Sequence, residues 1–295
     1  MASPQSEYLI RQPVPALAPY IERYIGYRLL GFPPGVHRGV PGRYMTLIVS
    51  IGPEIDVIAQ TDSAQAPDRY RCVVGGLQAS TALIAHDGNQ EGVAVQLTPL
   101  GSRALFGMPA RELWNLSGEL EDVVGGPATE LWERVQLARD WEERFAVCDD
   151  VFTRLVRDDE LEPALKRSWQ LLVGSSGTAP VAELAGTIGW TRQHFARRFA
   201  DEFGLAPKLA ARVIRFDRAR RMLETPFLSI AQVAYACGYY DQAHLTREFT
   251  ELAGVPPGRL LEGDLPSVQD NDAAGADHWA HEEQPNIRLA DPHLS

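Results

Sequence analysis

Two stretches of this sequence bring glutamine and arginine together on one face of an expected helix. In the first, Gln193 lies four residues before Arg197. In the second, the outer face carries four polar side chains: Gln242, His244, Thr246 and Arg247. Arginine can form paired hydrogen bonds with guanine, and glutamine can do so with adenine. The chemistry that these residue types offer is therefore the reading of base edges.

The elements that must position the second set lie within Ser229–Gly258. Apolar residues at helical spacing predict a short helix and then a second one, on Ile230, Val233, Ala234 and on Leu245, Phe249, Leu252. Gly238 ends the first helix, because glycine tolerates the positive φ of a tight turn. Asp241 is expected to cap the second helix by accepting a free amide of its first turn. Two helices joined in this way form a helix-turn-helix.

The same pattern occurs upstream, in Val181–Pro207. Ala185 and Gly189 lie 49 residues before Ala234 and Gly238, and Phe199, Gly204 and Pro207 lie 50 residues before Phe249, Gly254 and Pro257. The second copy thus has one added residue across its turn. Small residues and phenylalanines at such spacings also occur in ordinary helical bundles. Two copies with matching spacing favour a duplicated unit.

The region Pro163–Leu261, about a third of the chain, resembles the double helix-turn-helix DNA-binding domain of the AraC/XylS family of transcription regulators. The first unit carries the resemblance on Ala185, Gly189, Phe195, Phe199, Gly204 and Pro207. The second carries it on Ile230, Val233, Ala234, Gly238, Tyr239, Leu245, Phe249, Val255, Pro256 and Pro257. The run G-Y-x-D-x-x-x-L-x-R-x-F followed by G-V-P-P is the most specific part of this signature.

The resemblance implies double-stranded DNA as a partner, with two recognition helices in successive major grooves about 34 Å apart. Matching positions imply base contacts at Gln193, Ala196, Arg197, Gln242, Ala243, Thr246 and Arg247. The alanines offer only apolar contact, for example to a thymine methyl group. Phosphate contacts are expected at Thr191, Arg192, Arg198, Arg215, Asp241 and His244. The helix Lys208–Leu223 would join the two units, and further arginines on it are candidates for phosphate contact.

Charge is divided unevenly along the chain. The whole sequence carries −11, but residues 163–261 contain 13 Lys/Arg and 8 Asp/Glu, a net of +5, which leaves −16 for the rest. A basic segment beside an acidic remainder fits a DNA-binding module. Residues 262–295 hold eight acidic residues and one arginine, and we expect 263–295 to be a disordered acidic tail.

Composition predicts an ordinary globular protein of two domains, with residues 1–157 as the first, 158–162 as a linker and 163–262 as the second. No apolar run is long enough to span a membrane, and the N-terminus has no signal-peptide pattern. Three separated cysteines argue against a disulfide or zinc framework. We therefore expect a cytoplasmic protein without a membrane segment.

Residues 1–100 contain short strand-like runs separated by Gly, Pro and Asp clusters. They are Ile21–Leu30, Tyr44–Ser50, Ile55–Ala59, Arg71–Val74, Thr81–His86 and Val93–Leu97. These runs predict a small barrel or sandwich, and the family resemblance implies a cupin-like sensor. From 101 to 157 the pattern is helical, with helices expected to cover the barrel or to pair two protomers. The fold class is thus α+β, with a β-rich N-terminal domain, following helices and an all-α C-terminal domain.

A ligand pocket is expected near the entry to the strand at 44–50, lined by His37, Arg38, Arg43 and Tyr44. A metal-binding cupin would need clustered ligands, but His37 and His86 stand alone in the sequence, so no metal or cofactor is expected. No catalytic motif such as GxSxG or HExxH occurs.

We therefore expect a sequence-specific transcription regulator and no enzymatic activity. Its N-terminal domain would sense a small molecule or form a homodimer, and RNA polymerase would be a partner if the protein is an activator. Two alternatives stay open for that domain: an enzyme-like barrel with a DNA-binding appendage, and a domain that only dimerises.

Overall fold

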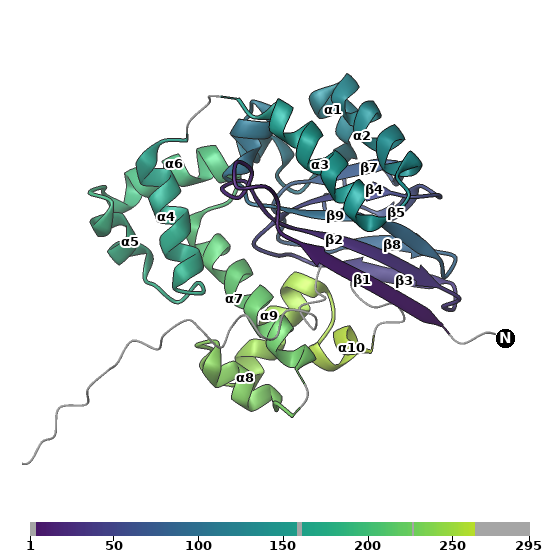
Figure 1. Ribbon diagram of the computed structural model, residues 1–295. Helices are drawn as coiled ribbons and strands as arrows, with labels where there is room; N and C mark the ends of the chain where they lie inside the picture. Colours follow the sequence, from purple (N-terminus) through teal and green to yellow (C-terminus); the bar gives the residue numbers. More distant parts are fainter. Residues whose placement is uncertain (1–3, 158–160, 226, 263–295) are drawn as a thin grey trace, which may run out of the picture.

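The structure is a computed structural model that describes residues 4–157, 161–225 and 227–262. The expected acidic tail 263–295 and most of the expected linker lie outside these ranges. Figure 1 shows two sheets with helices on one side and a second group of helices packed against their edge.

The N-terminal part folds into two antiparallel sheets. One sheet has six strands in the order β1 (Gln5–Arg11), β2 (Ile21–Leu30), β9 (Gln90–Leu97), β4 (Met45–Ser50), β7 (Cys72–Gly75) and β10 (Ser117–Glu119). The other has four strands in the order β3 (Gly35–Gly39), β8 (Ala82–His86), β5 (Ile55–Ala59) and β6 (Asp68–Tyr70). All six predicted strands are present. The four strands that were missed are short or largely exposed, so they lack a strong apolar pattern.

The two sheets form a sandwich. Between the strands that the structure describes, no ladder joins one sheet to the other, so the expected cupin-like barrel is not closed. The inner cluster consists of Ile48 and Val73 from the six-stranded sheet and Ile55, Val57, Tyr70, Ala82 and Ile84 from the four-stranded sheet. Burial of this cluster holds the sheets face to face.

Short helices cover the outer face of the six-stranded sheet. They are a π-helix η1 (Ser102–Phe106), a 3₁₀-helix η2 (Ala110–Leu113), and α1 (Leu120–Val124), α2 (Gly126–Leu137) and α3 (Trp141–Leu155). The ring of Trp141 lies on Gly26 of β2 so closely that an added Cβ would meet it at 2.6 Å. Leu131, Val135 and Phe145 are fully buried. The expectation of packing within the chain is confirmed for these helices.

The C-terminal part is helical throughout its described residues. Its helices are α4 (Pro163–Gly174), α5 (Val181–Thr187), α6 (Arg192–Phe203), α7 (Pro207–Glu224), α8 (Ile230–Ala236), α9 (Gln242–Ala253) and α10 (Pro257–Leu261). α7 runs between the α4–α6 group and the α8–α10 group (Figure 1). Among the helices described, none combines the length and the apolar character that a membrane span requires.

The hydrophobic core does not follow the expected domain boundary. A single cluster of buried residues begins at Leu17, includes the outer face of the six-stranded sheet and the helices α2 and α3, and continues through α4, α5 and α6 to Ile214 of α7. A second cluster holds α8 and α9 against α7 and includes Val40 of the N-terminal part. The sheets and the helix-turn-helix units therefore share apolar surface.

Candidate nucleic-acid interface

The first helix-turn-helix unit consists of α5 and α6. Gly189 turns the chain with φ of +75°, a conformation that side chains with a Cβ adopt only at a cost. The side chain of Thr191 then accepts a hydrogen bond from the amide of His194 at 3.3 Å. This N-cap satisfies one of the free amides of α6. The glycine turn that the repeat predicts is therefore confirmed, and the threonine cap follows directly after it.

The second unit repeats this construction with α8 and α9. Ser229 and Gln232 form a reciprocal capping box at the start of α8. Gly238 turns the chain with φ of +71°. The carboxylate of Asp241 accepts a hydrogen bond from the amide of His244 at 2.7 Å. α9 therefore begins, like α6, at a capped residue directly after a glycine turn.

Aromatic packing fixes the inner face of each recognition helix. In the first unit, Phe199 and Phe203 pack on each other with ring centres 4.5 Å apart, and Trp169 of α4 packs on both. In the second, Phe249 packs on Phe216 of α7 with ring centres 4.7 Å apart. Since one face of each helix is held in this way, the opposite face is directed outward.

The predicted base-reading residues lie mostly on that outward face. Gln193, Arg197, Gln242, Ala243 and Arg247 are exposed. Two others are only half-exposed: Ala196 and Thr246. Within the described part of the chain, no carboxylate lies within ion-pairing distance of Arg197 or Arg247. Both units thus present one glutamine and one unpaired arginine to solvent.

The predicted phosphate contacts divide into two groups. Arg192 is exposed and pairs with no acidic group of the described residues. Arg198, in contrast, forms an ion pair with Glu162 at 2.5 Å. Arg215 lies over the ring of Tyr239, with 5.1 Å between its Cζ atom and the ring centre. Arg192 is therefore the cation that is most available to a phosphate.

Three further candidates sit at the starts of the recognition helices. Thr191 and Asp241 use their side-chain oxygens to cap α6 and α9. The Nδ1 atom of His244 accepts a hydrogen bond from the amide of Tyr240 at 3.3 Å. The oxygens of the Asp241 carboxylate accept hydrogen bonds, as phosphate oxygens do. Contact of these residues with phosphate stays a prediction, whereas their part in capping is observed.

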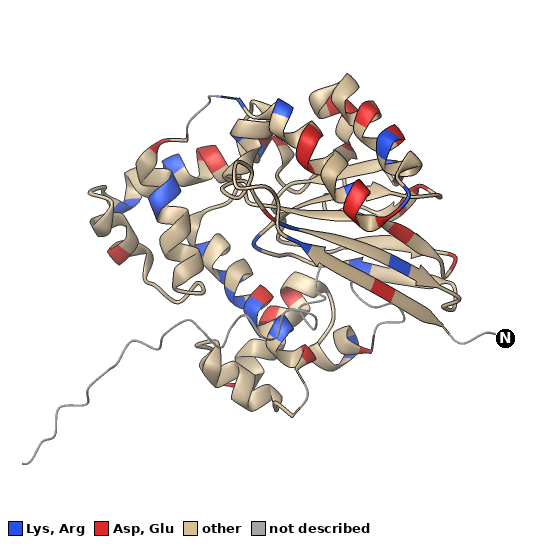
Figure 2. Cartoon of the chain, in the orientation of Figure 1, with Lys and Arg blue, Asp and Glu red and all other residues tan. Residues whose placement is uncertain are grey.

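The arginines of α7 are largely engaged within the protein. Arg212 pairs with Glu248 at 2.9 Å and with Glu251 at 2.7 Å. Arg220 and Arg221 both pair with Asp217 at 3.1 Å. Figure 2 shows several basic residues (blue) along α7, and acidic residues (red) on α2 and α3. Most of the arginine run therefore stabilises the helical domain instead of forming a solvated face.

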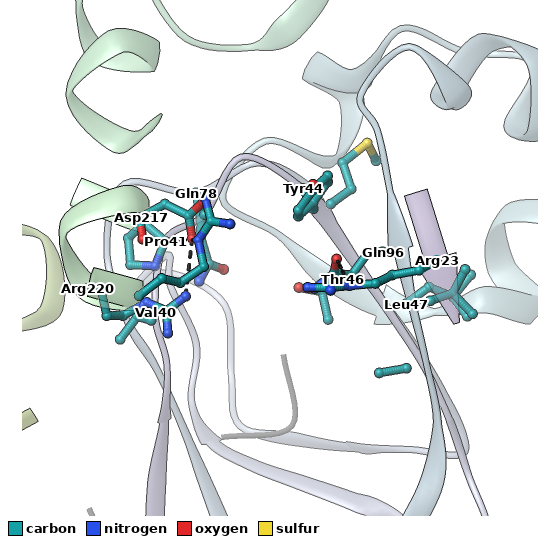
Figure 3. A pocket seen from close by; sticks show the side chains of 15 residues that line it. Arg23, Val40, Pro41, Tyr44, Thr46, Leu47, Gln78, Gln96, Asp217 and Arg220 are labelled. Atoms are coloured by element: carbon teal, nitrogen blue, oxygen red, sulfur yellow. Dashed lines mark hydrogen bonds and ion pairs between the residues drawn. The ribbon is translucent and has the colours of Figure 1, made fainter. Parts of the chain in front are cut away.

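A pocket lies between the six-stranded sheet and α7. The sheet side contributes Arg23 and Gln96, which share a hydrogen bond of 2.9 Å, and also Thr46. The helix side contributes three charged residues: Asp217, Arg220 and Arg221. Figure 3 shows Arg23 and Gln96 on one side of this space and Asp217 and Arg220 on the other. The lining thus combines groups from both parts of the chain.

Of the four residues expected to line a pocket, Tyr44 lines this one. Burial raises the pKa of Tyr44 to about 12, so its phenol is neutral. Arg43 packs its guanidinium over the Tyr44 ring instead. His37 and Arg38 belong to β3, not to a loop, and β3 belongs to the other sheet. One signal for the missed α7 residues was available, since Asp217 is the single acidic residue in the arginine run 212–221.

The two histidines that stand apart in the sequence meet in the fold. β3 pairs with β8, which brings the rings of His37 and His86 to 5.9 Å between centres. Burial, and then the neighbouring His86, lower the pKa of His37 to about 4. The pair has no third ligand: the described residues contain no group of three or more His, Cys, Asp or Glu that could hold a metal ion.

The N-terminal part holds both recognition helices at their C-terminal ends. At α6, Arg103 of η1 binds Glu202, and Trp114 lies against Gly204. At α9, the hydroxyl of Thr81 donates to the carbonyl of Leu252 at 3.1 Å. The starts of both helices, which carry the caps and the glutamines, are left uncovered by these contacts.

This fold and this site define a protein with two helix-turn-helix units in tandem, each with a capped recognition helix. Residues 177–263 match the family described as helix-turn-helix domain. This part of the chain is a helix-turn-helix domain, and the match agrees with the resemblance to the AraC/XylS family. Residues 10–119 match a family described as a domain of unknown function (DUF6597).

Curated relatives match over part of the chain. The HTH-type transcriptional regulator Rv1931c of Mycobacterium tuberculosis is 32% identical over 83 residues, which are 28% of this chain and 32% of the relative. The HTH-type transcriptional regulator GlxA of Rhizobium meliloti is 36% identical over 77 residues, 26% of this chain and 24% of the relative. The chain thus spans about a third of the first relative's length and a quarter of the second's.

Among solved structures, ToxT from Vibrio cholerae is similar over 88% of this chain and 97% of its own, with 12% identity and a TM-score of 0.48. A second solved structure is that of a transcriptional regulator from Chromobacterium violaceum, described as a protein that contains an AraC-type DNA-binding domain. It is similar over 35% of this chain and 92% of its own. Its identity is 22% and its TM-score 0.33.

Proposed function

We propose that this protein is a sequence-specific transcription regulator that binds double-stranded DNA through α6 and α9. The observation that carries the proposal is that each of two capped helices exposes a glutamine and an arginine: Gln193 with Arg197, and Gln242 with Arg247. The match of residues 177–263 to a helix-turn-helix family supports it, as do the matches to transcription regulators.

In this proposal each recognition helix enters a major groove with its capped end first. Arg197 and Arg247 donate paired hydrogen bonds to guanines, and Gln193 and Gln242 bind adenines. Ala196, Ala243 and Thr246 provide short contacts beside them. Arg192 holds a phosphate, and the amides at the starts of α6 and α9 provide further donors to the backbone.

The N-terminal part is proposed to control the two units through a small-molecule effector. The pocket between Arg23 and Gln96 on the sheet and Asp217 and Arg220 on α7 supports this role, because an occupant would touch both parts of the chain at once. An occupant that favours one arrangement of α7 over another would shift the population of DNA-binding molecules. Arg23, Arg220 and Arg221 against the single Asp217 favour a polar ligand with an anionic group.

We further propose that the protein forms a homodimer, contacts RNA polymerase and acts in the cytoplasm. These three properties fit a regulator of this type. We also propose no enzymatic activity. The alternative of an enzyme-like barrel gains no support from His37 and His86, which form a pair without a third partner of metal-binding type among the described residues.

The proposal is tested by selecting binding sites from random double-stranded DNA with the full-length protein. Fluorescence anisotropy at two salt concentrations would then compare the selected sequence with a shuffled one. We expect enrichment of a two-part site with its halves about one helical turn apart. Binding without sequence preference would contradict the proposal, because phosphate contacts alone cannot discriminate between sequences.

A further inference from the structure

Exposed aromatic side chains are concentrated in one part of this molecule. Among the large hydrophobic residues that the structure describes as exposed, three are aromatic, and all three lie in the second helix-turn-helix unit: Phe227, Tyr235 and Tyr240. The first unit has Thr178 and Gly186 at the positions that match Phe227 and Tyr235. The two units therefore differ in surface chemistry even though their recognition helices are alike.

Tyr240 is the residue that distinguishes the turn of the second unit. It is the residue added between the glycine turn and the capped helix, since Trp190 matches Tyr239 and Thr191 matches Asp241. Its side chain is 93% exposed. The ring of its neighbour Tyr239 is buried and packs edge-on against His244, with 5.3 Å between ring centres. The chain thus anchors Tyr239 and leaves Tyr240 outside.

The backbone at Tyr240 is held in place although its side chain is exposed. Its amide donates a hydrogen bond to Nδ1 of His244, in the first turn of α9. Asp241, the next residue, caps that helix. The N-terminal end of a recognition helix, where backbone amides are free, approaches the DNA backbone when the helix enters the major groove. Tyr240 therefore stands at the end of α9 that meets the phosphates, beside Gln242.

A cation of α7 lies beside this turn. The guanidinium of Arg215 lies over the ring of Tyr239, with 5.1 Å between its Cζ atom and the ring centre. Asp241 is the one acidic residue beside Tyr240 in the sequence, and its carboxylate is occupied as the cap. A polyanion is therefore the partner that fits the exposed hydroxyl of Tyr240 at the start of α9.

We propose that Tyr240 binds the DNA backbone beside the bases contacted by α9, with its hydroxyl donating to a phosphate oxygen and its ring covering the adjacent sugar. This assignment rests on the proposed DNA-binding function. Tyrosine is among the side chains that hold DNA phosphates. A hydroxyl contact of this kind neutralises no phosphate charge, so it releases no counterion and adds affinity without adding salt dependence. The second unit would then have an anchor that the first lacks.

The test compares Tyr240→Phe and Tyr240→Ala with wild type by anisotropy, on the selected DNA and at several salt concentrations. Tyr235→Phe is the matched control, because it removes a hydroxyl from a tyrosine that is 88% exposed on α8. We expect Tyr240→Phe to bind about tenfold more weakly, with the same slope of affinity against salt and the same base preference. Tyr240→Ala should bind more weakly still, and Tyr235→Phe should match wild type.

Two outcomes would overturn the assignment. Affinities of both Tyr240 variants within about twofold of wild type, well below the loss expected for a phosphate bond, would show that the hydroxyl and the ring touch no DNA. An equal loss in Tyr235→Phe would show that the effect is not specific to this position. Failure of wild-type protein to discriminate between sequences would instead remove the proposed function itself. Circular dichroism of each variant would confirm that the fold is retained.

Discussion

The guanidinium of Arg103 and the carboxylate of Glu202 form a two-pronged ion pair between η1 and the last turn of α6. Nε lies 2.9 Å from Oε1, and one Nη lies 2.9 Å from Oε2. Only 5% of Glu202 is exposed. The N-terminal part therefore holds a recognition helix by a buried charge on the end opposite to its capped start.

Replacing this carboxylate should destabilise the protein. Glu202→Gln keeps the shape of the side chain but leaves Arg103 without its charged partner. We expect the free energy of unfolding to fall by about 1–3 kcal/mol, measured by urea denaturation. Arg139→Gln is a suitable control, because it removes an exposed pair with Glu143, for which we expect the smaller change. Equal changes in the free energy of unfolding for the two variants would mean that burial does not strengthen the ion pair between Arg103 and Glu202.

The two glycines that end the recognition helices should respond differently to alanine. Gly204 and Gly254 have φ of +83° and +72°, so each alanine variant would carry about 1–2 kcal/mol of left-handed strain. An added Cβ at Gly204 would also meet Cβ of Trp114 at 2.5 Å, whereas at Gly254 the nearest atom is Nη1 of Arg38 at 3.7 Å. Thermal unfolding should therefore show a larger loss of stability for Gly204→Ala than for Gly254→Ala.

The base-reading arginines should affect specificity as well as affinity. Arg197→Ala and Arg247→Ala should each weaken binding to the selected DNA by about 1–3 kcal/mol and relax preference at one position of the site. Arg192→Ala should weaken binding to all sequences alike and reduce the salt slope by about 1. Anisotropy on a panel of single-base substitutions separates these results. A variant that keeps wild-type preference at every position would show that its helix does not read bases.

The His37–His86 pair should make stability depend on pH. The pKa of His37 is lowered to about 4 in the folded state, against an ordinary value of about 6.5. Between these two values the unfolded chain binds more protons than the folded one, so stability falls as pH falls. From about pH 7.5 to about pH 5 this residue alone should remove about 2 kcal/mol. Urea denaturation of wild type and of His37→Gln should differ in slope against pH over that interval; parallel curves would contradict the assignment.

Local rules were sufficient for the helix-turn-helix units. The glycine turn at Gly238 and the cap at Asp241 depend on neighbouring residues alone, and the repeat in Val181–Pro207 supplied a second copy of each. The exposed face of α9 followed from the apolar spacing of Leu245, Phe249 and Leu252. These features are encoded within a dozen residues, so a single sequence suffices to predict them.

Long-range packing could not be predicted in this way. His37 and His86 are brought together by the pairing of β3 with β8. The sequence of neither strand indicates which strand it pairs with. The pocket joins Arg23 of β2 to Asp217 of α7, nearly 200 residues apart. The expected pocket at His37, Arg38 and Arg43 was placed by proximity in the sequence, whereas the lining of the pocket described above depends on how α7 lies against the sheet.

The core shared by the N-terminal and C-terminal parts also affects how this chain folds during synthesis and how it tolerates truncation. Since the N-terminal part is synthesised first, its share of the common apolar cluster is uncovered until the C-terminal helices have left the ribosome. Truncation at the boundary before Pro163 would divide that cluster and leave apolar surface exposed on both products. We expect both fragments to aggregate more readily than the intact chain, which should melt in one cooperative transition.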